Sequence, residues 1–252
     1  MVMFYFSATG NSKYIAELFS EHMDCPCYSI EDRDDYSAEI NLADSVAFCY
    51  PIYGSRVPRI MRDFVFKHHD RLQNKRIVIL CTQMYFSGDG ARVFADMLPS
   101  AEVAYAEHIL MPNNVCNLFI IPLASDKNVR KYIEKAQIKI KSVCDDIKAG
   151  IVKKRGFNRF SRMLGSIQGR LMPMLEEKYK STVRVNNDCT NCRICVNNCP
   201  MKNLVSENNK IIQQNNCIIC YRCVNNCPKK AITTSWHGKV KKQYQLVCIK
   251  SS

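Results

Sequence analysis

Eight cysteines and two prolines near the C-terminus form two runs with the same spacing, C-x2-C-x2-C-x3-C-P. The first run comprises Cys189, Cys192, Cys195, Cys199 and Pro200, and the second comprises Cys217, Cys220, Cys223, Cys227 and Pro228. Three thiolates spaced in this way can bind one four-iron cluster, whereas the fourth thiolate, beside the proline, ligates the other cluster. The spacing therefore predicts two [4Fe-4S] clusters, one held by Cys189, Cys192, Cys195 and Cys227 and the other by Cys217, Cys220, Cys223 and Cys199.

The alternatives to iron–sulfur chemistry are two zinc sites or a disulfide framework. Zinc usually takes its ligands in two pairs, and disulfides require an oxidising compartment, so the pattern favours clusters. The two twelve-residue runs agree at 8 positions, including a shared Val-Asn-Asn, which indicates an internal repeat. The stretch 183–234 resembles a two-cluster bacterial ferredoxin domain.

A second candidate site lies near the N-terminus, where the apolar segment 2–6 is followed by a small, hydroxyl-rich loop. Apolar residues at helical spacing follow the loop, so the segment reads as strand, loop and helix. Such a loop can bind a phosphate with backbone N–H groups at a helix N-terminus and with hydroxyl donors. The candidate phosphate ligands are Ser7, Thr9, Gly10, Asn11 and Ser12; a plain helix cap is the alternative.

Strands and helices alternate through the first 150 residues. Strands are expected at 2–6, 45–50, 76–82 and 103–110, with another at 25–29, and helices are expected at 58–68 and 129–149. This alternation predicts a doubly wound α/β fold with a parallel sheet covered on both faces. Ligands of such sheets bind at the carboxyl ends of the strands.

The Ser-Ala-Thr-Gly-Asn-Ser loop and the loops after the next strands resemble those of flavodoxins. The resemblance implies that FMN binds here, with its phosphate at 7–12 and its ring between two later loops. The implied ring-binding residues are Pro51, Ile52, Tyr53 and Gly54 in one loop and Tyr85, Phe86, Gly88, Asp89 and Gly90 in the other. For each aromatic residue, ordinary packing under the loop is the alternative.

The remaining segments suggest four parts: a flavodoxin-like domain at 1–150, a basic helical connector at 151–182, the ferredoxin domain at 183–235 and a tail at 236–252. The connector carries apolar residues at helical spacing and a net charge of +6, and Pro173 is expected to end or kink its helix. A basic amphipathic helix can lie on a membrane or bind a partner. We favour a connector whose apolar face packs between the domains, because an electron route needs the domains held close.

The chain carries a formal net charge of +13, concentrated after residue 150. Although a basic chain can bind nucleic acid, we expect acidic redox proteins instead, and we expect no nucleic-acid partner. Many cysteines without a secretory signal favour the cytoplasm, and no apolar run reaches the length of a membrane span.

Taken as a whole, the chain resembles the flavodoxin–ferredoxin fusion proteins of anaerobic microbes, an α/β flavodoxin-like domain with a small C-terminal α+β ferredoxin domain. The resemblance implies an electron-transfer protein that passes electrons between two [4Fe-4S] clusters and FMN, with a ferredoxin or its oxidoreductase as partner. Two alternatives are a flavin-dependent reductase of a quinone or small organic acceptor, and a redox sensor or nucleic-acid binder that uses the basic connector. No catalytic acid, base or nucleophile is predicted.

Overall fold

The computed structural model describes residues 1–85, 88–117, 122–235 and 237–246. These residues form two compact units. Unit 1 comprises 1–111 and 131–172, and unit 2 comprises 112–130 and 173–252. The four-part division expected from the sequence remains a prediction.

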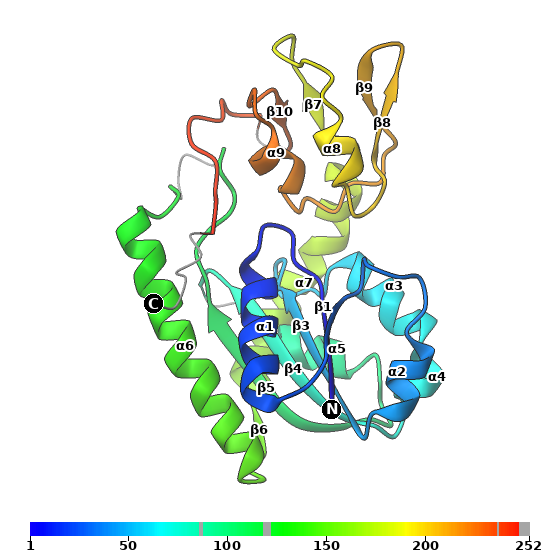
Figure 1. The fold of residues 1–252 in the computed structure, drawn as a ribbon, viewed down its shortest axis with the longest axis vertical. Helices are drawn as coiled ribbons and strands as arrows, with labels where there is room; N and C mark the ends of the chain where they lie inside the picture. Colours follow the sequence, from blue (N-terminus) through cyan, green and yellow to red (C-terminus); the bar gives the residue numbers. More distant parts are fainter. Residues whose placement is uncertain (86–87, 118–121, 236, 247–252) are drawn as a thin grey trace. The chain divides into compact units, whose positions relative to one another are not determined.

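Unit 1 is built on a parallel sheet with the strand order β2-β1-β3-β4-β5-β6 (Figure 1). The strands are β1 (Val2–Tyr5), β2 (Cys27–Ser29), β3 (Ser45–Pro51), β4 (Arg76–Gln83), β5 (Glu102–Leu110) and β6 (Lys153–Lys154). The first five strands were expected from the sequence. The order runs outward in both directions from β1, as a doubly wound sheet requires, and therefore brings the loops after β1, β3 and β4 to one edge.

Buried side chains explain why these segments form strands. The central strands are long apolar runs, and all of 77–83 in β4 is buried because the sheet is covered on both faces. Aromatic rings fill the space beside the sheet: Phe48 and Phe94 lie 4.7 Å apart between centroids, and Tyr50 stacks on Phe94 at 5.3 Å. Burying each such ring stabilises the fold by about 2 kcal/mol.

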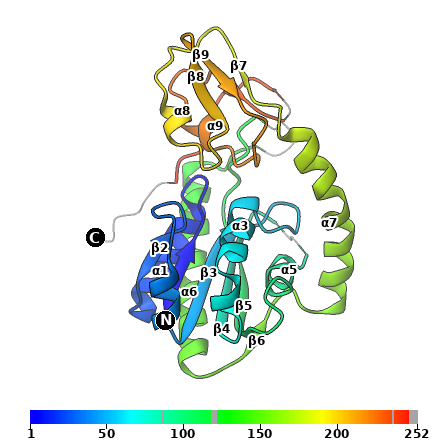
Figure 2. The same ribbon diagram turned by 90° about the vertical axis from the view of Figure 1, so that its right-hand side faces the viewer.

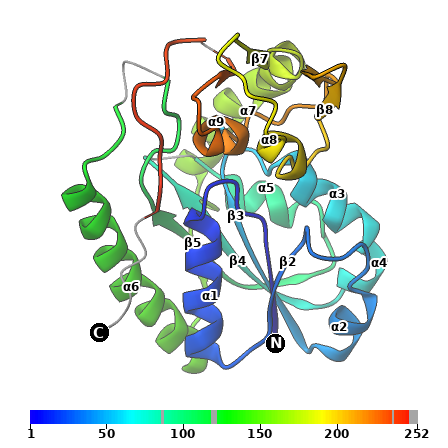
Figure 3. The same cartoon turned by 45° about the horizontal axis from the view of Figure 1, so that its top comes forward.

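Helices cover both faces of the sheet. Helices α1 (Asn11–Met23) and α6 (Asp126–Lys148) lie on one side, and α3 (Arg59–Lys67) and α5 (Gly90–Ala95) lie on the other (Figures 2 and 3). Two shorter helices, α2 (Ser37–Leu42) and α4 (His69–Leu72), contact each other. The two-sided cover confirms the flavodoxin-like α/β class expected from the strand–helix alternation.

The connector helix is packed within unit 1 through a face other than its apolar one. Helix α7 (Arg159–Tyr179) continues through Pro173, and its apolar residues Phe160, Met163 and Ile167 are 55–61% exposed. The face that packs is made of small or polar residues instead, with Ser161 and Gly165 buried. Within unit 1 the helix is thus packed through its small residues, which let its backbone approach its neighbours closely, whereas packing of the apolar face between the domains stays a prediction.

The described part of unit 2 holds two short sheets and two short helices, besides one end each of α6 and α7. Strand β7 (Arg184–Val185) pairs antiparallel with β10 (Ile232–Thr233), and β8 (Leu204–Glu207) pairs with β9 (Lys210–Gln213) in a hairpin. The hairpin turn has left-handed backbone at both Asn208 and Asn209, the conformation that a type I′ turn needs. Helices α8 (Ile194–Asn197) and α9 (Arg222–Asn226) each carry one cysteine of a run. Short strands and helices of this kind confirm the small α+β domain.

Two segments outside the cysteine runs complete unit 2. Val240 and Tyr244 of the tail are buried, and Gln243 donates hydrogen bonds to the carbonyls of Val224 (2.9 Å) and Cys227 (2.7 Å). In the segment after β5, the side-chain N–H group of Asn117 donates a hydrogen bond to the Thr234 carbonyl at 3.1 Å. The described tail, 237–246, contains no strand, so it serves as an arm that packs on this domain.

Within the described residues, no helix is long and apolar enough to cross a membrane.

Candidate functional site

The two cysteine runs share a backbone conformation as well as a spacing. Left-handed residues that are not glycine occur at Asn191, Arg193 and Lys202, and again 28 positions later at Ile219, Tyr221 and Lys230. Such a conformation costs about 1–2 kcal/mol per residue and is most unusual for a β-branched residue such as Ile219. The repeated strain shows that both loops are wound in the same way around the cysteines.

The cysteines line two separate cavities. Lining one cavity, among other residues, are Cys189, Cys192, Cys195 and Cys227. Lining the second are Cys199, Cys217, Cys220 and Cys223. Each cavity thus takes three thiols from one run and one from the other, and four thiols are the donor set of a [4Fe-4S] cluster. Among the described residues, no three His, Cys, Asp or Glu side chains are grouped so as to hold a single metal ion.

Backbone amides point at four of the sulfurs in a repeating pattern. The N–H groups of Asn191 and Ile219 donate to Sγ of Cys189 (3.4 Å) and Cys217 (3.3 Å). In the same way, the N–H groups of Asn203 and Ala231 donate to Sγ of Cys199 (3.2 Å) and Cys227 (3.3 Å). Amide donors stabilise thiolate charge and are one means by which a protein sets the potential of a cluster. The amide pattern therefore also fits bound clusters.

Burial opposes ionisation of the innermost thiols. It raises the pKa of Cys195 to about 11 and that of Cys220 to about 12. Because iron binds the thiolate, metal loading has to displace the protons from these side chains.

A polar centre at Asn225 supports the second cysteine run. Its side-chain N–H group donates to the carbonyls of Asn114 (2.9 Å) and Tyr221 (3.0 Å), and its oxygen accepts from Tyr244 N–H (2.7 Å). It thus joins α9 to the segment after β5 and to the tail. This role was not predicted from the sequence, although Asn225 belongs to the repeated Val-Asn-Asn.

The loop between β1 and α1 has the features of an anion site. Gly10 has φ 103°, which an L side chain would strain, and precedes a thirteen-residue helix that has no side-chain cap. The Gly10 N–H donates to the Ser7 hydroxyl (3.2 Å), and Ser12 is buried and hydrogen-bonded to Thr82 (2.7 Å). Ser7, Thr9 and Asn11 are half-buried. The uncapped helix N-terminus suits a phosphate group.

The loop after β3 turns sharply at Gly54 and Ser55, which both have left-handed backbone. Tyr53 and Arg56 exchange backbone hydrogen bonds of 3.1 Å across this turn, and the Ile52 N–H donates to the Thr82 carbonyl at 2.9 Å. Pro51, Ile52 and Tyr53 are half-buried, and Gly54 is exposed. Thr82 therefore joins this loop to the β1–α1 loop, since it also bonds Ser12.

The loop after β4 combines an exposed tip with a buried end. Tyr85 is 62% exposed, whereas Gly88, Asp89 and Gly90 are buried. Asp89 forms an ion pair with Arg92 at 2.6 Å. A Cβ atom on Gly90 would lie 2.5 Å from Cδ1 of Ile52, so packing accounts for this glycine. Phe86, the remaining predicted ring contact, lies outside the described residues.

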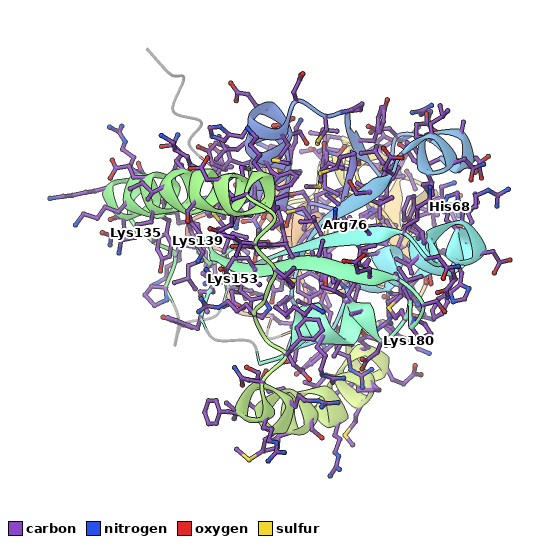
Figure 4. All side chains as sticks on the ribbon, turned by 90° about the horizontal axis from the view of Figure 1, so that it is seen from below. His68, Arg76, Lys135, Lys139, Lys153 and Lys180 are labelled. Atoms are coloured by element: carbon purple, nitrogen blue, oxygen red, sulfur yellow. The ribbon has the colours of Figure 1, made fainter. Side chains whose placement is uncertain are left out.

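Two buried polar residues in β5 were not singled out from the sequence. Glu107 is fully buried and forms ion pairs with Lys139 (2.6 Å) and Arg155 (3.3 Å); Figure 4 shows Lys139 on α6. His108 is also buried, and burial, assisted by repulsion from Arg155, lowers its pKa to about 4. The signal in the sequence is an adjacent Glu-His pair within an otherwise apolar strand.

Two segments of the chain match known protein families. Residues 2–120 match a family described as a flavodoxin domain, and residues 188–232 match a family described as a 4Fe-4S dicluster domain. This pair agrees with a flavodoxin–ferredoxin fusion and supports an electron-transfer flavo-iron–sulfur protein. The flavodoxin domain implies FMN, and the dicluster domain implies 4Fe-4S clusters.

Solved structures similar to this chain are flavodoxins and related proteins. They include flavodoxin 2 from Bacillus cereus (20% identity; 58% of this chain and 97% of that chain covered; TM-score 0.39). A WrbA-like flavodoxin from Agrobacterium tumefaciens is 18% identical, with 59% of this chain and 97% of that chain covered and a TM-score of 0.39. The Megasphaera elsdenii flavodoxin is 17% identical, with 55% of this chain and 99% of that chain covered and a TM-score of 0.37. No curated protein matches the chain.

Proposed function

We propose that this chain, in which a flavodoxin domain is joined to a 4Fe-4S dicluster domain, carries one FMN and two [4Fe-4S] clusters and passes electrons between them. FMN exchanges one or two electrons and each cluster exchanges one, so the three groups together can divide or collect an electron pair. The observation that carries the proposal is the grouping of the eight cysteines around two cavities, in a chain that also has a flavodoxin domain.

In this proposal the ligands of the clusters cross between the cysteine runs. Cys189, Cys192, Cys195 and Cys227 hold one cluster, and Cys217, Cys220, Cys223 and Cys199 hold the other. The cavity linings support this assignment, as do the four amide hydrogen bonds to sulfur. Cross-ligation ties together a unit that has only short strands and helices of its own.

FMN is assigned to the edge of the sheet where the loops after β1, β3 and β4 end. The uncapped helix N-terminus at 10–12 supports binding of the phosphate, and the two later loops are assigned to the ring. Thr82 supports a common site, because it is hydrogen-bonded to the first loop through Ser12 and to the second through Ile52.

The redox partner is proposed to be a protein with an acidic face, such as a ferredoxin or its oxidoreductase. Residues 183–252 carry a net charge of +9 before cofactors are counted, and Arg193 and Lys229 line the first cysteine cavity. An oxidised [4Fe-4S] cluster with four thiolates contributes about −2, so two clusters leave this segment basic. Opposite charges would steer such a partner toward the clusters.

Anaerobic purification of the full chain tests the cofactor content. We expect about eight irons per chain from the two four-iron motifs, together with FMN that is released by denaturation and identified by chromatography. Gly10→Val should remove FMN and leave the iron content unchanged, because valine cannot adopt φ 103° without strain. About four irons, zinc in their place, or FAD in the extract would contradict the proposal.

A further inference from the structure

Helix α7 is fastened to the loop after β3 by polar contacts within unit 1. The Ser55 hydroxyl donates to Oε1 of Gln168 at 2.5 Å, and Nε of Arg56 donates to the Gly169 carbonyl at 3.0 Å. Ser55 is fully buried, so its side chain lies in a closed contact with the helix. A loop assigned to the FMN ring is thus attached to a helix that the sequence predicts only as a connector.

The loop after β4 packs against the same helix through two glycines. A Cβ atom on Gly88 would lie 2.7 Å from the Ser55 hydroxyl and 2.9 Å from Cα of Gly165. A Cβ atom on Gly165 would lie 1.6 Å from Oδ1 of Asp89. All three distances are shorter than real Cβ contacts, so glycine is needed at both positions for the loop and the helix to meet.

Asp89 cannot readily move away from such a Cβ atom. Its side chain is fully buried, and Oδ2 accepts hydrogen bonds from Nε (2.8 Å) and Nη2 (2.6 Å) of Arg92. Any side chain at position 165 would therefore displace the helix or the loop. Gly169 differs, because its Cβ atom would meet Nε of Arg56 at 3.6 Å, an ordinary contact distance.

We propose that α7 is a structural part of the flavin site, with Gly165 as the positioning residue that lets the helix hold both ring-binding loops. The inference rests on the proposed function, since it takes these two loops as the ring site. A site binds more tightly when its loops are held in place before the ligand arrives. Because linkage is reciprocal, bound FMN stabilises the docked helix to the same extent that the docked helix favours FMN.

The first test compares FMN dissociation constants of the full-length protein and two glycine variants, with urea unfolding as the measure that unit 1 is folded and iron content as the measure that unit 2 is intact. Gly165→Ala should weaken FMN binding at least about 10-fold and keep the wild-type iron content. Gly169→Ala is the matched control, because it brings the same gain in helix propensity without a clash, and it should change affinity less than about 2-fold. Gln168→Ala removes only the hydrogen bond from Ser55 and should weaken binding to an intermediate degree.

The second test measures the reciprocal effect by hydrogen exchange of the wild-type protein, before and after FMN is removed. Removal of FMN should speed exchange of the α7 amides at 161–169, whereas the amides of β1 should change little. Wild-type FMN affinity in Gly165→Ala, or unchanged exchange in α7, would overturn the inference while leaving the proposed function intact. A wild-type chain that binds no FMN would instead overturn the proposed function.

Discussion

Cys227 ends the second cysteine run, yet it lines the same cavity as Cys192 of the first run. Its counterpart Cys199 lines the other cavity, with the three thiols of the second run. The exchange is repeated in both runs, because in each of them a short helix carries the third cysteine and ends before the fourth. Removal of Cys199 or Cys227 should therefore damage the cluster that the other three cysteines of its own run do not hold.

Double substitutions test this exchange by counting iron. Cys199→Ser combined with Cys220→Ser should cost one cluster only, because both cysteines are assigned to the same cavity, and should leave about four irons. Cys199→Ser combined with Cys192→Ser should cost both clusters and leave almost none. Iron analysis after anaerobic purification gives the counts, and the flavin content serves as the control for folding.

The opposite pattern of iron loss would show that each cysteine run holds its own cluster. In that case Cys199→Ser with Cys192→Ser would keep about four irons, and Cys199→Ser with Cys220→Ser would keep almost none.

The stability of the flavodoxin domain should depend on the ionisation of His108. Burial and Arg155 lower its pKa from 6.5 to about 4, although Glu107 acts in the opposite direction. Between these values the unfolded chain binds a proton that the folded chain does not, so the free energy of unfolding falls as the pH falls from about 6.5 toward 4. The loss from this residue amounts to about 3 kcal/mol at most.

Urea unfolding of the protein at several pH values measures the effect. His108→Gln should make the acid side of the stability profile less steep than that of the parent protein. If the free energy of unfolding of His108→Gln falls with pH as steeply as that of the parent protein, the imidazole of His108 does not take up a proton on unfolding between about pH 6.5 and pH 4.

The features that could be predicted from the sequence are those in which local chemistry dictates spacing. A cuboidal cluster requires thiols at fixed intervals, so the sequence alone predicts the same grouping of eight cysteines that lines the two cavities. The β1–α1 loop could be recognised in the same way, because Gly10 and its small neighbours follow an apolar strand. For both sites the constraint lies within a few consecutive residues.

Features that depend on distant partners could not be predicted in this way. The apolar spacing of 160–171 did not indicate the tight fit of Gly165 against Asp89, which determines the face of α7 that is packed within unit 1. Nothing near Asn117 in the sequence indicates its hydrogen bond to Thr234. Strand β6 was missed because a pair of exposed lysines has no apolar alternation.

The exposed apolar residues of α7 should contribute little to stability. Ile167→Ser should change the free energy of unfolding by less than about 0.5 kcal/mol, because the side chain is 57% exposed. Val143→Ser on α6 should cost more than about 2 kcal/mol, because that side chain is 1% exposed and serine would leave both a cavity and a buried hydroxyl. Urea unfolding under identical conditions compares the two, and an equally large loss at Ile167 would mean that its side chain is packed in solution.

Reduction of the chain by an acidic ferredoxin should depend on salt and on charges beside the cysteine cavities. The association rate should fall about 10-fold between low and high salt, because screening shortens the reach of the field around the basic unit 2. Lys229→Gln changes a residue that lines the first cavity and should slow association about 2-fold to 5-fold, whereas Lys13→Gln, on α1 and ion-paired with Glu17, should have no such effect.

After the encounter, flavin reduction should follow cluster reduction at a rate independent of protein concentration, since all three redox groups belong to one chain. Rapid mixing with reduced ferredoxin, observed separately at cluster and flavin wavelengths, measures both steps. Association rates that depend neither on salt nor on the Lys229→Gln substitution would show that the electrons enter by another route. Fast flavin reduction by NADPH alone would show the same.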